Sequence, residues 1–361
     1  KTRVDLPKLG PVSLSASYLH SEREGDTRNL GAETVWDHGP ATGGRMGTEK
    51  SPERLGDTDV EGFFLAADID LHPDVALSYK FDYSQNDFTS EAAGANYLLT
   101  PAALKYGGIN PAVLAAYSLY NASPNPKTPI DDERPDAVNN WFTTPGHSEA
   151  WGHNFTASWQ LNDTLSFKNI LALRSSEVDS SYQLDGLGGV VAGGAPFGFV
   201  LNNSQSEDEQ WSNELQMNIS TDRFDITAGL IHFHSEQDTG GYDKEFNTLQ
   251  FSTILGQNTA VFPTRFVIPG NTGYKKHSVQ VDSDAAYVQP EIHLTDRLDV
   301  FVGARVTRDD KDGKETLPGS IAAPSLGRSV PIEYEDTRDT WTAGVNYRLT
   351  DDILTYAKYA T

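Results

Sequence analysis

The stretch that decides the fold runs from Phe63 to Tyr83 and reads FFLAADIDLHPDVALSYKFDY. Apolar side chains occupy every second position from Phe63 to Leu71 and again from Val75 to Tyr83. A period of two places alternate side chains on opposite faces of a β-strand. Between the two runs lie His72, Pro73 and Asp74, and proline and aspartate favour tight turns. The stretch therefore predicts two long antiparallel strands joined by a short turn.

The same pattern recurs along the whole chain. Further alternating runs lie at Val12–Tyr18, Trp151–Leu161, Leu165–Leu173, Trp211–Ile219, Phe224–Leu230, Ala286–Leu294, Leu298–Val306, Trp341–Leu349 and Ile353–Tyr359. Turn residues such as Asn162-Asp163-Thr164 and Thr295-Asp296-Arg297 join them in pairs. Arg3 to Lys8 precede the first turn and read as the stub of an earlier strand. We therefore expect eleven full strands and one stub.

Long polar connections separate these pairs, at residues 20–59, 85–148, 175–209, 236–283 and 308–338. Five such loops would be unusual in a compact soluble domain. Short turns at one rim and long loops at the other are typical of outer-membrane barrels. Several predicted strands reach the roughly 9–11 residues that a tilted strand needs to cross a membrane. The predicted fold class is therefore all-β, a transmembrane antiparallel up-and-down β-barrel.

Composition excludes several classes of protein. The chain of 361 residues has 28 Lys and Arg against 51 Asp and Glu, a formal net charge of -23, which disfavours nucleic-acid binding. It has no cysteine, which excludes disulfides, thiolate metal sites and cysteine nucleophiles. No apolar run is long enough for a membrane-spanning helix. An outer-membrane location is compatible with all of this, because barrel strands are apolar on one face only.

The expected barrel is incomplete. Bacterial barrels have an even number of strands, and an open edge in lipid leaves backbone groups without hydrogen-bond partners. Residues 1–361 are therefore expected to be part of a single outer-membrane β-barrel domain, with strands missing at both ends. Lys1 to Leu9 also lack the apolar segment of a signal peptide.

Four segments resemble the barrel of TonB-dependent outer-membrane receptors. They run from Val4 to Tyr18, from Trp211 to Leu230, from Leu294 to Arg305 and from Thr342 to Tyr359. The more specific parts are Ser212-Asn213-Glu214-Leu215 and Gly303-Ala304-Arg305-Val306. The resemblance covers the strands, whereas the long loops have no recognisable match.

This resemblance implies a 22-stranded barrel, of which about 11–12 strands are here, closed by an N-terminal plug domain that the chain does not show. It implies uptake of a scarce ligand, with an iron–siderophore complex as the first guess. The implied partners are outer-membrane lipid, the TonB energy-transducing complex acting through the plug, and an extracellular small molecule such as a metal chelate. A passive porin-like barrel stays open as the alternative, and a soluble all-β enzyme is a third reading.

Catalytic patterns are absent from the sequence. It contains no Gly-x-Ser-x-Gly and no His-Glu-x-x-His element. His232 and His234 resemble a metal pair, but they read better as hydrated residues that continue a strand face beyond the membrane. We therefore expect no enzyme activity, no catalytic residues, no metal site and no cofactor.

Binding residues are predicted only coarsely. Five cations fall on the polar face of predicted strands and would point into the lumen: Lys80, Lys168, Arg174, Arg305 and Arg348. Such charges tune a pore or contact a plug, although they read equally well as the plain polar face of each strand. In the loops, the aromatic residues Trp36, Trp141 and Tyr274 are candidates for ligand contact, and the ligand-binding residues are otherwise unknown.

Overall fold

A computed structural model of the chain describes residues 2–6, 10–38, 46–97, 118–192, 195–196, 198, 201–241, 275–317 and 328–361. Twelve strands form one antiparallel sheet, in which each strand pairs with its neighbours in sequence order. This confirms the predicted up-and-down architecture of eleven strands and a stub. The strands are β1 (Thr2–Leu6), β2 (Gly10–Arg23), β7 (Thr58–His72), β8 (Val75–Phe88), β10 (Thr144–Gln160), β11 (Leu165–Gln183), β14 (Leu201–Ser220), β15 (Phe224–Gly241), β16 (Lys275–Thr295), β17 (Leu298–Leu317), β18 (Arg328–Thr350) and β19 (Ile353–Ala360).

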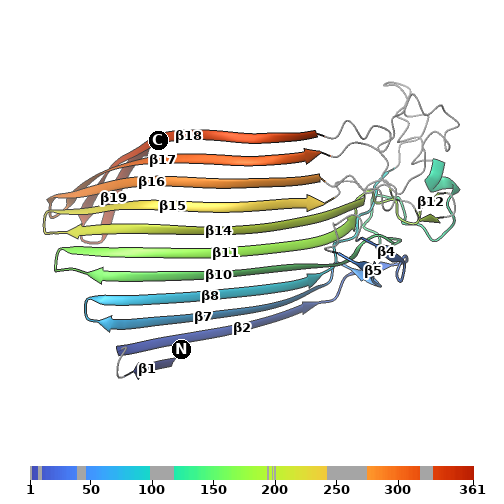
Figure 1. The fold of residues 1–361 in the computed structure, drawn as a ribbon, viewed down its shortest axis with the longest axis horizontal. Coiled ribbons are helices and arrows are strands. Elements are labelled where there is room, and N and C mark those ends of the chain that lie inside the picture. The colour runs from blue at the N-terminus through green and yellow to red at the C-terminus, as the bar shows by residue number, and fades with distance from the viewer. Residues whose placement is uncertain are drawn as a thin grey trace.

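The two ends of the sheet differ in their connections (Figure 1). At one end, here called the turn rim, short turns join the strands in pairs, as from β10 to β11 and from β14 to β15. In the first of these turns, Asn162 Oδ1 accepts hydrogen bonds from the backbone N–H groups of Thr164 and Leu165, at 2.9 and 3.0 Å. At the other end, the loop rim, the long connections gather.

The strands extend further toward the loop rim than the sequence predicts. Loops were expected at 175–209, 236–283 and 308–338, but β11 continues to Gln183, β17 to Leu317, and β18 already starts at Arg328. Some of these added segments are polar on both faces, as in Ser204–Gln210 of β14, and others have only a short apolar alternation, as at Val330, Ile332 and Tyr334 of β18. The expected loop boundaries are wrong there because the long apolar alternation of the strand middles does not continue to the loop rim, whereas backbone pairing does.

One face of the sheet exposes a broad set of large apolar side chains. Leu65, Leu215, Leu230 and Val302 expose between 45% and 60% of their surface. The register places these residues with the other apolar members of the alternating runs, for example Leu215 opposite Leu230. A continuous apolar face of this size is expected where a surface meets lipid or a partner. Within the described residues, no helix is long and apolar enough to cross a membrane.

Buried aromatic residues lie in the loops at the loop rim. Three short sheets form there, from β3 (Thr27–Asn29), β6 (Arg54–Leu55) and β9 (Ala137–Val138), from β4 (Val35–Asp37) and β5 (Thr48–Lys50), and from β12 (Val191–Ala192) and β13 (Ala195–Pro196). Trp141 and Phe142 form a buried cluster, against which Trp36 packs. Loops far apart in sequence thus fold into one unit, here called the loop cap (described residues 24–38, 46–57, 118–143 and 184–192).

Candidate functional site: the concave face and the loop cap

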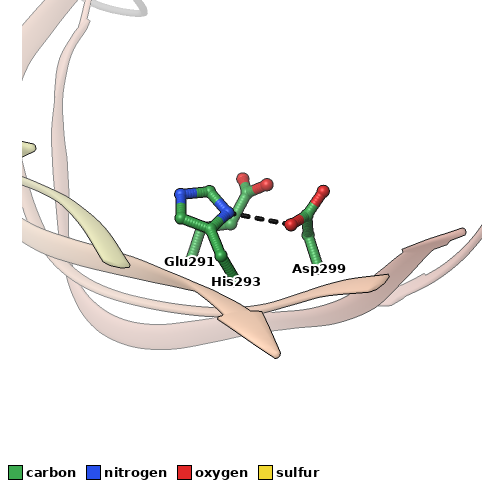
Figure 2. A group of neighbouring side chains, drawn as sticks. All are labelled: Glu291, His293 and Asp299. Carbon is green, nitrogen blue, oxygen red and sulfur yellow. Dashed lines mark hydrogen bonds and ion pairs between the residues drawn. The ribbon is translucent and has the colours of Figure 1, made fainter. Parts of the chain in front are cut away.

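The sheet curves, and Glu291, His293 and Asp299 lie inside the curve (Figure 2). Residues paired across antiparallel strands point to the same face. Tyr287 lies on the same face of β16 as Glu291 and His293, because it is separated from them by an even number of residues. The register joins Tyr287 with Lys168, Gln216, Gly229 and Arg305 in one row, which therefore lies on this concave face. The apolar face described above is the opposite, convex one.

All five cations predicted to face the lumen occupy positions on the concave face. Besides Lys168 and Arg305, the register brings Lys80 opposite Asn154 and Arg174 opposite Gly152, and Arg348 alternates with the convex Tyr347. Arg174 forms an ion pair with Asp82 across β10. The intervening residue is Gly152, where a Cβ atom would lie 2.9 Å from Asp82 Oδ1. The missing side chain at 152 leaves room for this ion pair.

A second polar group occupies the middle of the concave face. The Tyr287 hydroxyl donates a hydrogen bond to Glu214 Oε1 at 2.7 Å, and Gln216 Nε2 donates to the same oxygen at 2.9 Å. The Tyr287 ring lies over Gly229, whose added Cβ would be 2.6 Å from the ring. These residues form a fixed patch of donors and acceptors inside the curve. In the sequence, Glu214 is marked by the segment Ser212–Leu215, and no pattern connects it with Tyr287.

Two buried asparagines hold the loop cap together. Asn29 Nδ2 donates to Ser51 Oγ at 2.9 Å, and Asn29 Oδ1 accepts from the backbone N–H groups of Gly31 and Asn140, each at 2.9 Å. Asn140 Oδ1 in turn accepts from the N–H groups of Phe142 and Thr143. These bonds replace the strand pairing that irregular loops lack, because a buried backbone group needs a partner. The loops before and after β7 and β8 are thereby fixed to each other.

Two of the three aromatic loop candidates meet in the cap. The ring centroids of Trp36 and Trp141 are 4.9 Å apart, and Phe142 lies 5.4 Å from Trp36. Trp141 is buried, with 2% of its surface exposed, whereas Trp36 is half-buried. Of the two rings, Trp36 is therefore the more exposed, and Trp141 packs against it. Tyr274 lies outside the described residues.

His38 lies between the aromatic cluster and strand β10. Its ring contacts Phe142 edge-on at 5.0 Å, and its Nε2 lies 3.1 Å from Thr144 Oγ1, which lies 2.7 Å from Ser181 Oγ. Burial lowers the pKa of His38 from 6.5 to about 4, against smaller opposing effects of Asn203 and Asp37. The ring is therefore neutral at physiological pH. No pattern in the sequence marks this residue, since a lone histidine in a loop belongs to no motif.

A cavity of about 320 Å³ lies between residues 129 and 131–135 of the cap and residues 92 and 94–96 of the segment that follows β8. Three acidic residues, Asp131, Asp132 and Glu133, line it together with Arg134. Arg134 donates a hydrogen bond to Asp26 at 2.7 Å and thereby holds the pKa of that carboxyl below its usual range. The net charge of the lining is negative, so the cavity suits a polar or cationic group. No sequence motif marked this segment.

The described residues bring together one set of side chains with metal-ligating geometry, Glu291, His293 and Asp299 at the turn rim (Figure 2). His232 and His234, the pair considered from sequence, each contact an aspartate of β16, at 2.8 and 2.7 Å, on the convex face. The spacing Glu291-x-His293, followed by Asp299 after a tight turn, was the available signal. This spacing points to a common site only once the register between β16 and β17 is known, because the register brings Asp299 opposite His293.

Comparison with solved structures shows the same fold in siderophore receptors. The ferric yersiniabactin uptake receptor FyuA of Yersinia pestis is 14% identical with a TM-score of 0.60, over 98% of this chain and 42% of that one. The ferric-catecholate import receptor Fiu of E. coli K-12 is 12% identical with a TM-score of 0.60, over 99% and 51%. The siderophore receptor PiuA of Acinetobacter baumannii is 13% identical with a TM-score of 0.58, over 99% and 46%. The chain thus spans about half the length of these receptors.

No curated protein matches the chain in sequence. Residues 104–361 match the family described as TonB dependent receptor-like, beta-barrel, and this match covers most of the sheet and part of the loop cap. The twelve-stranded meander, its convex apolar face and its asymmetric rims agree with that match. The chain therefore belongs to the family of TonB-dependent receptor β-barrels.

Proposed function

We propose that the protein is an outer-membrane receptor that takes up a scarce extracellular ligand, an iron–siderophore complex, with energy supplied by TonB. Membership of the receptor family carries this proposal. The three named receptors bind or import ferric siderophores according to their descriptions, which makes this ligand class the first to test. No covalent chemistry is needed, because the protein supplies a binding surface and a gated path.

In this proposal the parts of the molecule have separate roles. The convex apolar face contacts outer-membrane lipid, the loop rim faces outward, and the turn rim faces the periplasm. Residues 1–361 form part of one barrel domain, and TonB acts through a plug domain outside them. The concave cations Lys80, Lys168, Arg174, Arg305 and Arg348 then line the lumen, where they contact the plug or the passing ligand.

The loop cap is proposed as the surface that captures the ligand. Its loops are held in one arrangement by Asn29 and Asn140, so little conformational entropy is lost when a ligand binds. Trp36 offers a half-buried ring at the edge of the aromatic cluster, and Tyr274 stays a predicted contact. A rigid aromatic side chain is a common anchor for a ligand.

Uptake in cells tests the proposal. A strain without the gene is grown under iron limitation with one ferric siderophore at a time as the iron source. We expect at least one siderophore class to support growth only when both the gene and TonB are present. A passive porin-like barrel would instead give uptake without TonB and steady ion conductance of the purified protein in planar bilayers.

A matched pair of tryptophan variants tests the binding surface. Trp36→Ala should weaken ligand binding about tenfold, which corresponds to about 1.4 kcal/mol. Trp211→Ala removes an equally large ring on the convex face, where it stacks on His232 at 4.7 Å, and should leave ligand affinity unchanged. Equal losses in both variants would show that binding does not involve the cap.

A further inference from the structure

A mixed group of one histidine and three carboxylates lies on the concave face at the turn rim. Asp225 comes from β15, Glu291 and His293 from β16, and Asp299 from β17. The register pairs Asp225 with Glu291 and His293 with Asp299, so all four side chains point inside the curve. One ligand atom from each of Glu291, His293 and Asp299 lies within 4.8 Å of the others (Figure 2).

The two ring nitrogens of His293 have different surroundings. Nδ1 lies 2.8 Å from Asp299 Oδ1, on the side of the metal-ligating group, and Nε2 lies 3.1 Å from Asp225 Oδ2. A carboxylate that accepts the Nε2 proton fixes the tautomer whose Nδ1 carries a free lone pair. Metal-binding histidines commonly show this arrangement, in which a carboxylate that does not touch the metal accepts the proton of the other ring nitrogen. Asp225 therefore holds the ring in the state needed to bind a cation.

The charge balance also favours a cation at this position. In the described part of the chain, neither lysine nor arginine forms an ion pair with Asp225, Glu291 or Asp299. Three carboxylates thus face one histidine, which as an imidazolium could supply only one positive charge. The other histidine–carboxylate pairs of the described strands do not form such a three-ligand group.

We propose that Glu291, His293 and Asp299 bind one divalent first-row transition-metal ion of the Zn²⁺ class at the periplasmic rim, with Asp225 as the positioning residue. One imidazole and two carboxylates suit zinc, cobalt or manganese, and water completes the coordination. The ion links β16 to β17, and Asp225 extends the connection to β15. This proposal departs from the expectation of no metal site, and it does not depend on which ligand the receptor takes up.

Direct metal binding tests it. The full chain, without a histidine tag, is purified in detergent, depleted of metal and titrated with Zn²⁺ by calorimetry and with Co²⁺ by visible absorbance. We expect one equivalent to bind and Co²⁺ to give d–d bands. His293→Ala should lower the affinity at least tenfold. Asp225→Asn should lower it about tenfold, the usual loss when the carboxylate that orients a metal-binding histidine is removed.

Two further variants keep the outcome clear. Glu291→Gln keeps the side-chain shape and removes a ligand charge, so weakened binding in this variant cannot be ascribed to misfolding. His232→Ala removes the His232–Asp284 pair, whose 2.8 Å contact resembles that of His293, and should leave the affinity unchanged. The proposal is overturned if the wild-type chain binds no Zn²⁺ when the free Zn²⁺ concentration reaches about 100 μM. It is also overturned if His232→Ala weakens Zn²⁺ binding as much as His293→Ala does.

Discussion

At the scale of single residues, glycine positions on the concave face decide which neighbours fit. Gly229 lies directly opposite Tyr287 in the register, and its missing side chain makes room for the tyrosine ring. The ring can then reach Glu214 two strands away. An aromatic ring over a glycine on the next strand also covers backbone that would otherwise lie open. Gly152, between Asp82 and Arg174, serves the same purpose for an ion pair.

Enlarging Gly229 should therefore cost stability. Gly229→Val places a branched side chain where the Tyr287 ring lies, and we expect the free energy of unfolding to fall by about 1–3 kcal/mol, as for other overpacked sites. Urea unfolding followed by tryptophan fluorescence measures this. The double variant Gly229→Val/Tyr287→Ala should recover part of the loss. If it is no more stable than the single variant, the clash is not the cause.

His38 makes the stability of the loop cap depend on pH. Its pKa is about 4 in the folded cap, below the ordinary 6.5, because the ring is buried. The unfolded state thus binds the proton more tightly. The stabilisation is complete above pH 6.5 and is lost as the pH falls toward 4, by up to about 3 kcal/mol. Hydrogen exchange of residues 27–38 between pH 7 and 4 should show the cap opening.

His38→Gln is the control for this pH dependence. Glutamine does not titrate and can still hydrogen-bond to Thr144, so the cap of this variant should open much less on acidification. Equal opening in both proteins would show that His38 is not the cause of the pH dependence.

At the scale of elements, the turns at the turn rim were predicted more closely than the loop-rim ends. Leu165 and Leu298 begin strands as the sequence pattern predicts, and Leu161 and Leu294 lie within one residue of a strand end. Apolar alternation and turn-forming side chains both signal these ends. Beyond the apolar layer, strands such as β11 and β14 continue on backbone pairing with little periodic apolar signal in the side chains. In β18, polar residues 335–340 separate the short alternation of Val330, Ile332 and Tyr334 from the main apolar run.

The loop cap could not be predicted for a different reason. The sequence singled out Trp36 and Trp141 separately, as aromatic residues in polar loops. Their contact depends on the parallel pairing of β3 with β9 and on the Asn29 hydrogen bonds, which join segments more than a hundred residues apart. Single-sequence patterns carry no information about such distant pairs.

The turn between β10 and β11 tests the role of side-chain hydrogen bonds at these ends. Asn162→Ala removes the acceptor for the N–H groups of Thr164 and Leu165 and should lower the free energy of unfolding by about 1 kcal/mol. Asn162→Asp keeps the acceptor and should stay close to wild type. Denaturant unfolding of both variants gives the comparison. Similar losses in both would mean that the amide's other contacts matter more.

At the scale of the whole molecule, the sheet and the loop cap are stabilised by different interactions. The sheet depends on strand pairing and on the environment of its convex face, whereas the cap depends on buried polar bonds and a small aromatic cluster. The two parts should therefore respond separately to mutation.

Asn29→Ala is the variant that separates them. It leaves buried N–H groups of Gly31 and Asn140 without an acceptor, at about 1–3 kcal/mol for each unsatisfied group. We expect protease cleavage in the cap to accelerate while the heat resistance of the sheet in detergent is retained. Loss of both together would show that the cap and the sheet fold as one cooperative unit.

The sequential order of the strands has a consequence for how such a protein is made and how it changes. Since every strand of the twelve-stranded sheet pairs only with the strands before and after it in that sheet, the sheet can be extended one hairpin after another. Gain or loss of a hairpin changes the circumference without rethreading the chain. The connections at the loop rim can likewise be exchanged one at a time, because they do not take part in the pairing of the strand middles.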